Sequence, residues 1–233
     1  MNIEQILNEL KNFSDKKLAD HHAKFFKTGK GEYAEGDLFY GIKVPEVRKI
    51  SNKYFKNIDL NEIDILIKNP FHEARLTAIL MLVLKYPKSS FEEKEKIYNL
   101  YLNNVNYINN WDLVDISAQY VVGPFLFKNN PQKLLELAES DHLWSQRISI
   151  LATFYFIRQG EYSQTIELAK LFLNHNHDLM HKATGWMLRE VGKRDINVLY
   201  SFLDKFHKVM PRTMLRYSIE KIPKEKRSIY MKK

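Results

Sequence analysis

Apolar side chains recur at helical spacing along most of the 233-residue chain. The apolar face of one predicted helix, for example, consists of Leu199, Phe202, Leu203 and Phe206. These positions follow the alternating steps of three and four residues that keep side chains on one face of an α-helix. Asp59 and Glu62 have the spacing of a capping box and predict the start of another helix. Because no segment alternates convincingly between apolar and polar residues, the pattern predicts an all-α fold.

One extended stretch breaks this helical pattern. It runs from Lys27 to Val44, KTGKGEYAEGDLFYGIKV, and contains four of the eight glycines. A loop of this length inside a helical domain is usually functional or flexible. We expect it to help cover a binding groove.

Four helical segments resemble one another: HEARLTAIL, WSQRISILA, MHKATGWML and RTMLRYSIE. The basic positions that they share are Arg75, Arg147, Lys182 and Arg216. The separations are 72, 35 and 34 residues, and 72 is two intervals of 36. A period of about 35 residues with two helices per unit is typical of a HEAT-like (ARM-type) solenoid, and also of tetratricopeptide repeats, whose signature residues are not evident. The period therefore predicts a helical-repeat solenoid that occupies residues 1–233 as a single domain.

Composition narrows the class of protein further. The sequence is 45% hydrophobic and 27% charged, as in an ordinary folded globule, and it contains no cysteine. The absence of cysteine excludes disulfides, thiolate metal sites and a cysteine nucleophile. The longest apolar run, AILMLVL, is far shorter than the roughly 20 residues of a membrane-spanning helix, and the N-terminus lacks the pattern of a signal peptide. We expect a cytoplasmic protein with no membrane partner.

The net charge of +8 is concentrated in residues 205–233, which alone carry +8. The repeat also places basic residues in an equivalent register on successive second helices, with Arg189, Lys193 and Arg194 nearby. In a solenoid these helices line one concave face, so the basic residues would form a stripe that tracks a phosphate backbone. Two alternatives remain open: a solvated lysine-rich tail, and arginines that pair with acids of neighbouring repeats.

Tryptophan is the rarest residue present, and its three copies, Trp111, Trp144 and Trp186, stand near the starts of predicted helices. Asp115 lies four residues after Trp111, so that both project from one helix face. Aromatic rings, a carboxylate and arginines on one surface suit a cationic base held in DNA, because rings and the carboxylate attract the cation while arginines bind phosphates. The alternative is that the tryptophans belong to the core and the aspartate favours the helix dipole.

Other chemistries have weaker support in the sequence. The eight histidines show no metal-ligand spacing, and His175 and His177 fall in a predicted turn between helices. No phosphate-binding Gly-Lys-Ser/Thr loop, dinucleotide fingerprint or Gly-x-Ser-x-Gly elbow is present. We therefore expect neither a metal nor a cofactor.

Four blocks of the sequence carry a resemblance to a known family. They are FKTGKGEYAEGDLFYGIKVPEVRKI, NNWDLVDISAQYVVGPFL, LWSQRISILATF and HKATGWMLREVGKR. In combination these blocks resemble the DNA alkylation repair glycosylases of the HEAT-like repeat type. The resemblance implies a monofunctional enzyme that acts on duplex DNA. It would cut the bond between deoxyribose and a cationic alkylated purine such as 3-methyladenine or 7-methylguanine.

The same resemblance assigns the site residues. The catalytic carboxylate of the Trp-Asp-x-x-Asp block matches Asp115, with Trp111 and Trp186 flanking the lesion. An arginine at the DNA backbone matches Arg147, and Phe25 stands where some members carry a tyrosine near the DNA. The expected phosphate contacts are Arg147, Lys182, Arg189, Lys193 and Arg194.

Two other functions remain open from the sequence. The first is a non-catalytic HEAT-repeat protein that binds distorted or branched DNA, which would keep the basic stripe but not need the aspartate. The second is a helical-repeat scaffold for protein partners. For the glycosylase we expect a monomer.

Overall fold

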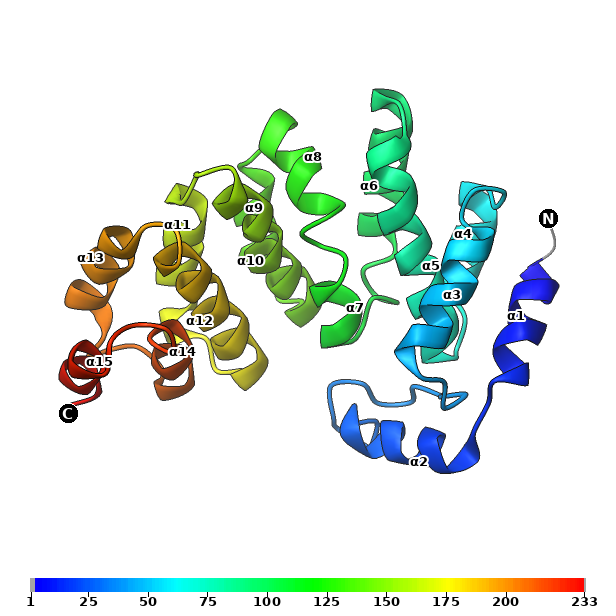
Figure 1. Ribbon diagram of the computed structural model, residues 1–233, viewed down its shortest axis with the longest axis horizontal. Coiled ribbons are helices and arrows are strands. Elements are labelled where there is room, and N and C mark those ends of the chain that lie inside the picture. The colour runs from blue at the N-terminus through cyan, green and yellow to red at the C-terminus, as the bar shows by residue number, and fades with distance from the viewer. Residues whose placement is uncertain (1–2, 233) are drawn as a thin grey trace. The chain divides into compact units, whose positions relative to one another are not determined.

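The computed structural model describes residues 3–232 and is all-α, which confirms the predicted fold class. The described residues form fifteen α-helices and two short 3-10 helices, and no strands beyond one isolated bridge between Leu38 and Phe71. The chain divides into two compact units, Met1–Val121 and Val122–Lys233. Figure 1 draws the first from blue to green and the second from green to red.

The first unit is built around a buried central helix. Its helices are α1 (Ile3–Asn12), α2 (Lys16–Phe25), α3 (Val44–Tyr54), α4 (Leu60–Ile67), α5 (His72–Lys85), α6 (Phe91–Asn103) and α7 (Trp111–Asp115), with a 3-10 turn η1 at Tyr86–Lys88. Both α3 and α4 pack against α5, whose residues from His72 to Leu82 are all buried. In Figure 1, α2 lies crosswise to α1 and α3 at one end of them.

The predicted capping box begins α4. The Asp59 carboxylate accepts from the Glu62 backbone N–H at 2.8 Å, and the Glu62 carboxylate accepts from the Asp59 N–H at 3.1 Å. Each acceptor satisfies an N–H that the first helical turn leaves without a partner. This helix start was therefore correctly predicted from residue spacing.

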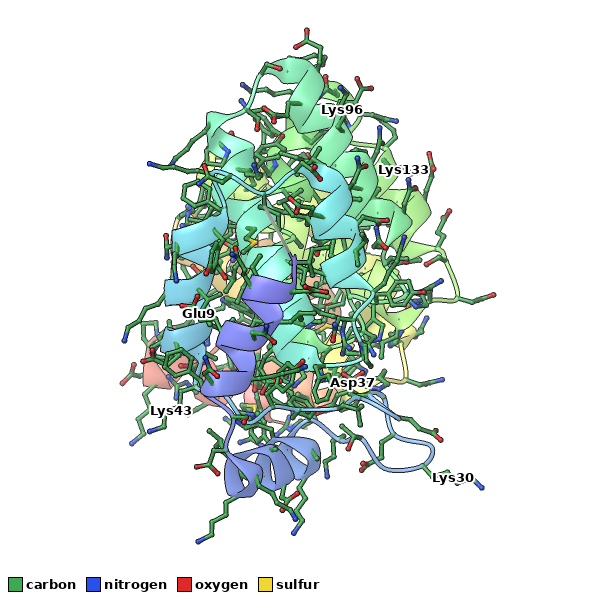
Figure 2. All side chains as sticks on the ribbon, turned by 90° about the vertical axis from the view of Figure 1, so that its right-hand side faces the viewer. Glu9, Lys30, Asp37, Lys43, Lys96 and Lys133 are labelled. Carbon is green, nitrogen blue, oxygen red and sulfur yellow. The ribbon has the colours of Figure 1, made fainter. Side chains whose placement is uncertain are left out.

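The irregular stretch between α2 and α3 is also as predicted, and a buried carboxylate anchors its second half. The Glu73 side chain accepts hydrogen bonds from the backbone N–H groups of Tyr40, Gly41 and Ile42 at 2.9, 2.9 and 3.1 Å. Gly41 has φ of +80°, and a Cβ there would collide with the backbone of α2. Figure 2 shows Lys30 at the outer end of this loop and Asp37 where the chain returns to the helices.

The second unit consists of helices that pack mainly around α10 and α12. They are α8 (Val122–Asn129), α9 (Lys133–Ala138), α10 (Leu143–Arg158), α11 (Ser163–Leu171), α12 (Asp178–Gly192), α13 (Ile196–Phe206), α14 (Arg212–Ser218) and α15 (Lys224–Met231), with a 3-10 turn η2 at Phe172–Asn174. The helix α10 packs against α8, α9 and α12, and α12 packs against α13 and α14. In α13 the predicted apolar face is buried at Leu199, Phe202 and Leu203.

Two glycines of this unit lie where the backbone of one helix approaches another closely. A Cβ on Gly123 of α8 would lie 2.5 Å from the carbonyl oxygen of Ala152 in α10. A Cβ on Gly185 of α12 would lie equally close, 2.5 Å, to the carbonyl oxygen of Met214 in α14. Both helix pairs therefore approach at a distance that only glycine permits.

Candidate functional site

The motif that contains Trp111 and Asp115 forms α7 in the first unit. The Asn110 side chain caps this short helix by accepting from the Trp111 backbone N–H at 2.8 Å. Trp111 and Asp115 are its first and last residues, and both are half-buried. One helical turn thus presents an indole and a carboxylate together.

Aromatic rings from the end of α2 support the indole of Trp111. Phe25 meets it edge to face at a centroid distance of 6.0 Å, and Phe26 lies 5.5 Å away. Phe25 is 55% exposed. These three rings line part of a pocket of about 490 Å³ whose wall also includes His22 and Asp112.

A buried histidine, His72, forms part of the wall of this pocket. His72 is 2% exposed, and its Nε2 lies 2.8 Å from Oδ2 of Asp112. Its Nδ1 lies 3.6 Å from Oδ2 of Asp37, which also pairs with Arg75 at 2.6 Å. Burial alone would lower the pKa of His72, but the charge and hydrogen bond of Asp112, with Asp37, outweigh it and raise this pKa to about 9. His72 is therefore an imidazolium at neutral pH.

The charge of Asp115 acts on a neighbouring buried tyrosine. Burial raises the pKa of Tyr101; a hydrogen bond with Ser117 opposes the rise, and the charge of Asp115 adds to it. The Asp115 backbone carbonyl accepts from Nε2 of Gln119 at 3.1 Å. The half-buried carboxylate of Asp115 thus stands at the end of α7, close enough to Tyr101 for its charge to act on the phenol.

Trp186 belongs to α12 in the second unit and has an aromatic neighbour of its own. It meets Phe154 of α10 edge to face at 6.0 Å. Two guanidinium groups lie over the same Phe154 ring, that of Arg158 at 4.8 Å and that of Arg194 at 5.6 Å. The second unit therefore combines an indole, a phenyl ring and two cations.

A single buried acid holds several of the predicted phosphate-binding residues. Glu190 is 6% exposed and pairs with Lys193 at 2.6 Å and with Arg194 at 3.1 Å. Arg189 lies 3.9 Å from the same carboxylate and also pairs with Glu220. Glu190 is a local neighbour of these residues at the end of α12, whereas Glu220 follows α14. The Arg189–Glu220 pair is therefore the one that links separate helical segments, as in the alternative left open by the sequence. These ion pairs restrict the basic side chains, but the three cations exceed the two carboxylates by one positive charge.

The remaining two basic residues have different environments. Arg147 is 4% exposed, and its guanidinium donates to the backbone carbonyl of Leu179 at the start of α12. Lys182 is half-buried and pairs with Asp178 at 2.8 Å, one turn earlier on the same helix. Arg147 therefore joins two helices of the second unit, whereas Lys182 lies at the surface.

Among residues 3–232, no group of three or more histidine, aspartate or glutamate side chains is arranged to hold a metal ion. No helix in that range combines the length and apolar character needed to cross a bilayer. His175 and His177, predicted to lie in a turn, precede α12, and His177 is its N-cap.

Sequence reasoning missed the residues that support the two tryptophans. Phe26, Phe39 and His72 stack on one another beside Trp111, and Phe154 and Arg158 lie beside Trp186. Phe39 lies in the glycine-rich loop, Lys27–Val44. A large aromatic side chain in a loop indicates that the loop packs against other parts of the protein, and this signal could have identified Phe39. No spacing rule would have paired His72 with Asp112, since 40 residues separate them.

The described residues form an all-helical fold. Each unit has a cluster of aromatic rings, around Trp111 in the first and around Trp186 in the second, and in the second unit basic side chains lie beside the rings. The fold is similar to that of a solved structure described as a predicted DNA alkylation repair enzyme from Enterococcus faecalis. The match has a TM-score of 0.72 and 16% identity, and it covers 91% of this chain and 97% of that chain. At this identity, the similarity shows the fold alone. The sequence matches no curated protein.

The family model described as DNA alkylation repair enzyme matches residues 6–222. This range is nearly the whole chain and includes both units. The chain therefore belongs to the DNA alkylation repair enzyme family.

Proposed function

We propose that this protein is a monofunctional DNA glycosylase that releases cationic alkylated purines, of the 3-methyladenine and 7-methylguanine type, from duplex DNA. The observation that carries the proposal is the pairing of Trp111 and Asp115 on α7, beside the exposed ring of Phe25, in a chain of the DNA alkylation repair family. The proposal includes a HEAT-like solenoid that acts as a single monomeric domain in the cytoplasm, with its basic residues on a concave face.

The chemistry requires little beyond charge stabilisation. Alkylation makes the base cationic and therefore a good leaving group, so that no strong general acid is needed. As the glycosidic bond breaks, positive charge develops on the sugar. Asp115 stabilises this charge and orients the attacking water, while Trp111 contacts the lesion nucleotide.

The second unit contributes DNA contacts in this proposal. Trp186 contacts the lesion nucleotide, and Lys182, Arg189, Lys193 and Arg194 bind phosphates. The ion pairs of Glu190 support this role because they hold long side chains in place before DNA binds, which lowers the entropy lost on association. Arg147 acts from the interior, where its bond to the Leu179 carbonyl holds the start of α12.

The test is release of free 7-methylguanine and 3-methyladenine from methylated duplex DNA, comparing the native protein with Asp115→Asn. We expect release to fall about a hundredfold to a thousandfold, because one preorganised charge-stabilising group is lost. DNA affinity should change little, because the variant keeps the shape of the side chain. Asp141→Asn, an exposed aspartate in the second unit, is the matched control and should retain the native rate.

Two outcomes would contradict the proposal. If the native protein releases neither base yet binds DNA tightly, a non-catalytic DNA-binding protein is the better description. If Asp115→Asn retains the native rate, the protein is a glycosylase whose catalytic group lies elsewhere.

A further inference from the structure

The His72 imidazole contacts two residues that help to hold α7, the helix that carries Trp111 and Asp115, in place. One support is Asp112, the second residue of α7, whose Oδ2 lies 2.8 Å from Nε2 of His72. The other is Phe26, which stacks on the His72 ring at 5.0 Å and on the Trp111 indole at 5.5 Å. We propose that His72 is a positioning residue, which fixes α7 so that Trp111 and Asp115 keep the geometry needed for base release. This inference rests on the proposed glycosylase function.

The first route of positioning runs through the backbone of α7. A helix of only five residues has little stability of its own, so side-chain anchors determine where it lies. The second oxygen of Asp112, Oδ1, is buried and has no hydrogen-bond partner within residues 3–232. Asp112 therefore depends on His72, and loss of that bond would leave its carboxylate buried without a donor.

The second route runs through stacked rings. The His72 ring packs in one three-membered cluster with Phe26 and Phe39, at centroid distances of 5.0 and 4.9 Å and interplanar angles of 28° and 24°. Phe26 and Phe39 also stack on each other at 5.4 Å. A change in the position of the imidazole would therefore move Phe26, and with it the surface on which the Trp111 indole rests.

The same histidine links α7 to the glycine-rich loop. Asp37, in the second half of the loop, faces His72 at 3.6 Å and pairs with Arg75 of α5. Asp37 also accepts from the Asn109 side chain, two residues before α7, at 2.8 Å. The charged groups that face His72 are thus Asp37, Arg75 and Asp112, and two positive charges balance two negative ones while His72 is protonated.

The test uses His72→Gln, which keeps a side-chain amide donor but removes the ring and the charge. We expect the single-turnover rate of 7-methylguanine release to fall about tenfold or more, because a small misplacement of reacting groups is costly. The affinity for the same duplex should stay within about twofold, since no phosphate contact is lost. A merely structural role predicts loss of rate and affinity together with the folded fraction. An unchanged rate would overturn the inference.

A spectroscopic readout separates this inference from the proposed function. The protein has three tryptophans, so its ¹⁵N-labelled form gives three indole N–H signals, and Trp111→Phe identifies that of Trp111. His72→Gln should shift or broaden the Trp111 signal and leave those of Trp144 and Trp186 in place. If the native protein releases no base, the proposed function fails, and this signal still decides the positioning role: an unmoved Trp111 signal rejects it.

Three further variants guard against a folding defect. Asp112→Asn keeps the shape of the anchor but weakens its bond to His72, and it should change the rate and the Trp111 signal in the same direction. The double variant should cost less than the two single effects added together, because both remove one interaction. His207→Gln, the same substitution in the second unit, is the control and should leave rate and Trp111 signal unchanged.

Discussion

Burial and charge oppose each other at His72, and this balance has consequences for stability. A buried imidazole is ordinarily neutral, because burial penalises the charged form. Here Asp112 and Asp37 supply enough negative charge to raise the pKa to about 9, against the pull of burial and of Arg75 in the other direction. The folded protein therefore favours the protonated form of His72.

The pH dependence of unfolding follows from this raised pKa. The contribution of His72 to stability should be complete below about pH 6.5, its unfolded pKa, and should be lost as pH rises through about 9. A difference of this size corresponds to a free energy of about 3 kcal/mol. The free energy of unfolding, measured with urea at pH 6.5 and at pH 9.5, should fall by this amount in the native protein. It should fall by correspondingly less in His72→Gln. An equal loss in both proteins would mean that other groups cause it.

Helix pairs in the second unit depend on glycine where their backbones meet. Gly123 faces Ala152 and Tyr155, and Gly185 faces Met214 and Tyr217, so each glycine contacts two residues one turn apart on the second helix after its own. The same type of close contact thus recurs in two helix pairs.

Substitution at these contacts should destabilise the protein more than helix propensity suggests. Gly123→Ala would ordinarily favour a helix, since alanine is the better helix former. Here the added methyl group would overlap the carbonyl oxygen of Ala152, so we expect a loss of about 1–3 kcal/mol in the free energy of unfolding. Thermal unfolding measures it. Gly29→Ala, where the nearest atom belongs to a flexible glutamate, is the control, and an equal effect there would contradict the explanation.

The sequence predicted helix faces and helix starts well, because these features depend on residues that are close together in the chain. The apolar face of α13 follows from helical periodicity, and the start of α4 from the spacing of Asp59 and Glu62. The partners of His72 lie 35 and 40 residues away, and no periodicity connects them. Arg147 counts as one positive charge whether exposed or buried, so composition could not show that it donates to a backbone carbonyl.

The division into two units was equally invisible in the sequence. It falls between Val121 and Val122, inside an apolar stretch with no proline-, serine- or charge-rich linker beside it. Linkers are recognised by composition, whereas this division reflects only which helices contact one another. The single domain of residues 1–233 and its solenoid form stay predictions, which we include in the proposal.

Positive charge is distributed unevenly along the whole chain. Residues 205–233 carry the entire net charge of +8, yet part of this segment has structural roles. Arg212 donates to the Met231 carbonyl at 3.0 Å and Arg227 to the Glu220 carbonyl at 2.7 Å. Net charge alone therefore overstates how many cations are available to bind a polyanion.

Salt dependence of DNA binding counts the cations that do bind phosphates. If Lys182, Arg189, Lys193 and Arg194 are the contacts, log Kd should change with log salt with a slope of about 3.6 in magnitude. Lys182→Ala should reduce this slope by about one, while Lys96→Ala, an exposed lysine of α6, should leave it unchanged. A native slope well above four would assign further contacts to the C-terminal basic segment. A slope near zero would mean that the protein does not bind the phosphate backbone, and a scaffold for protein partners would then explain the helical repeat better than a glycosylase does.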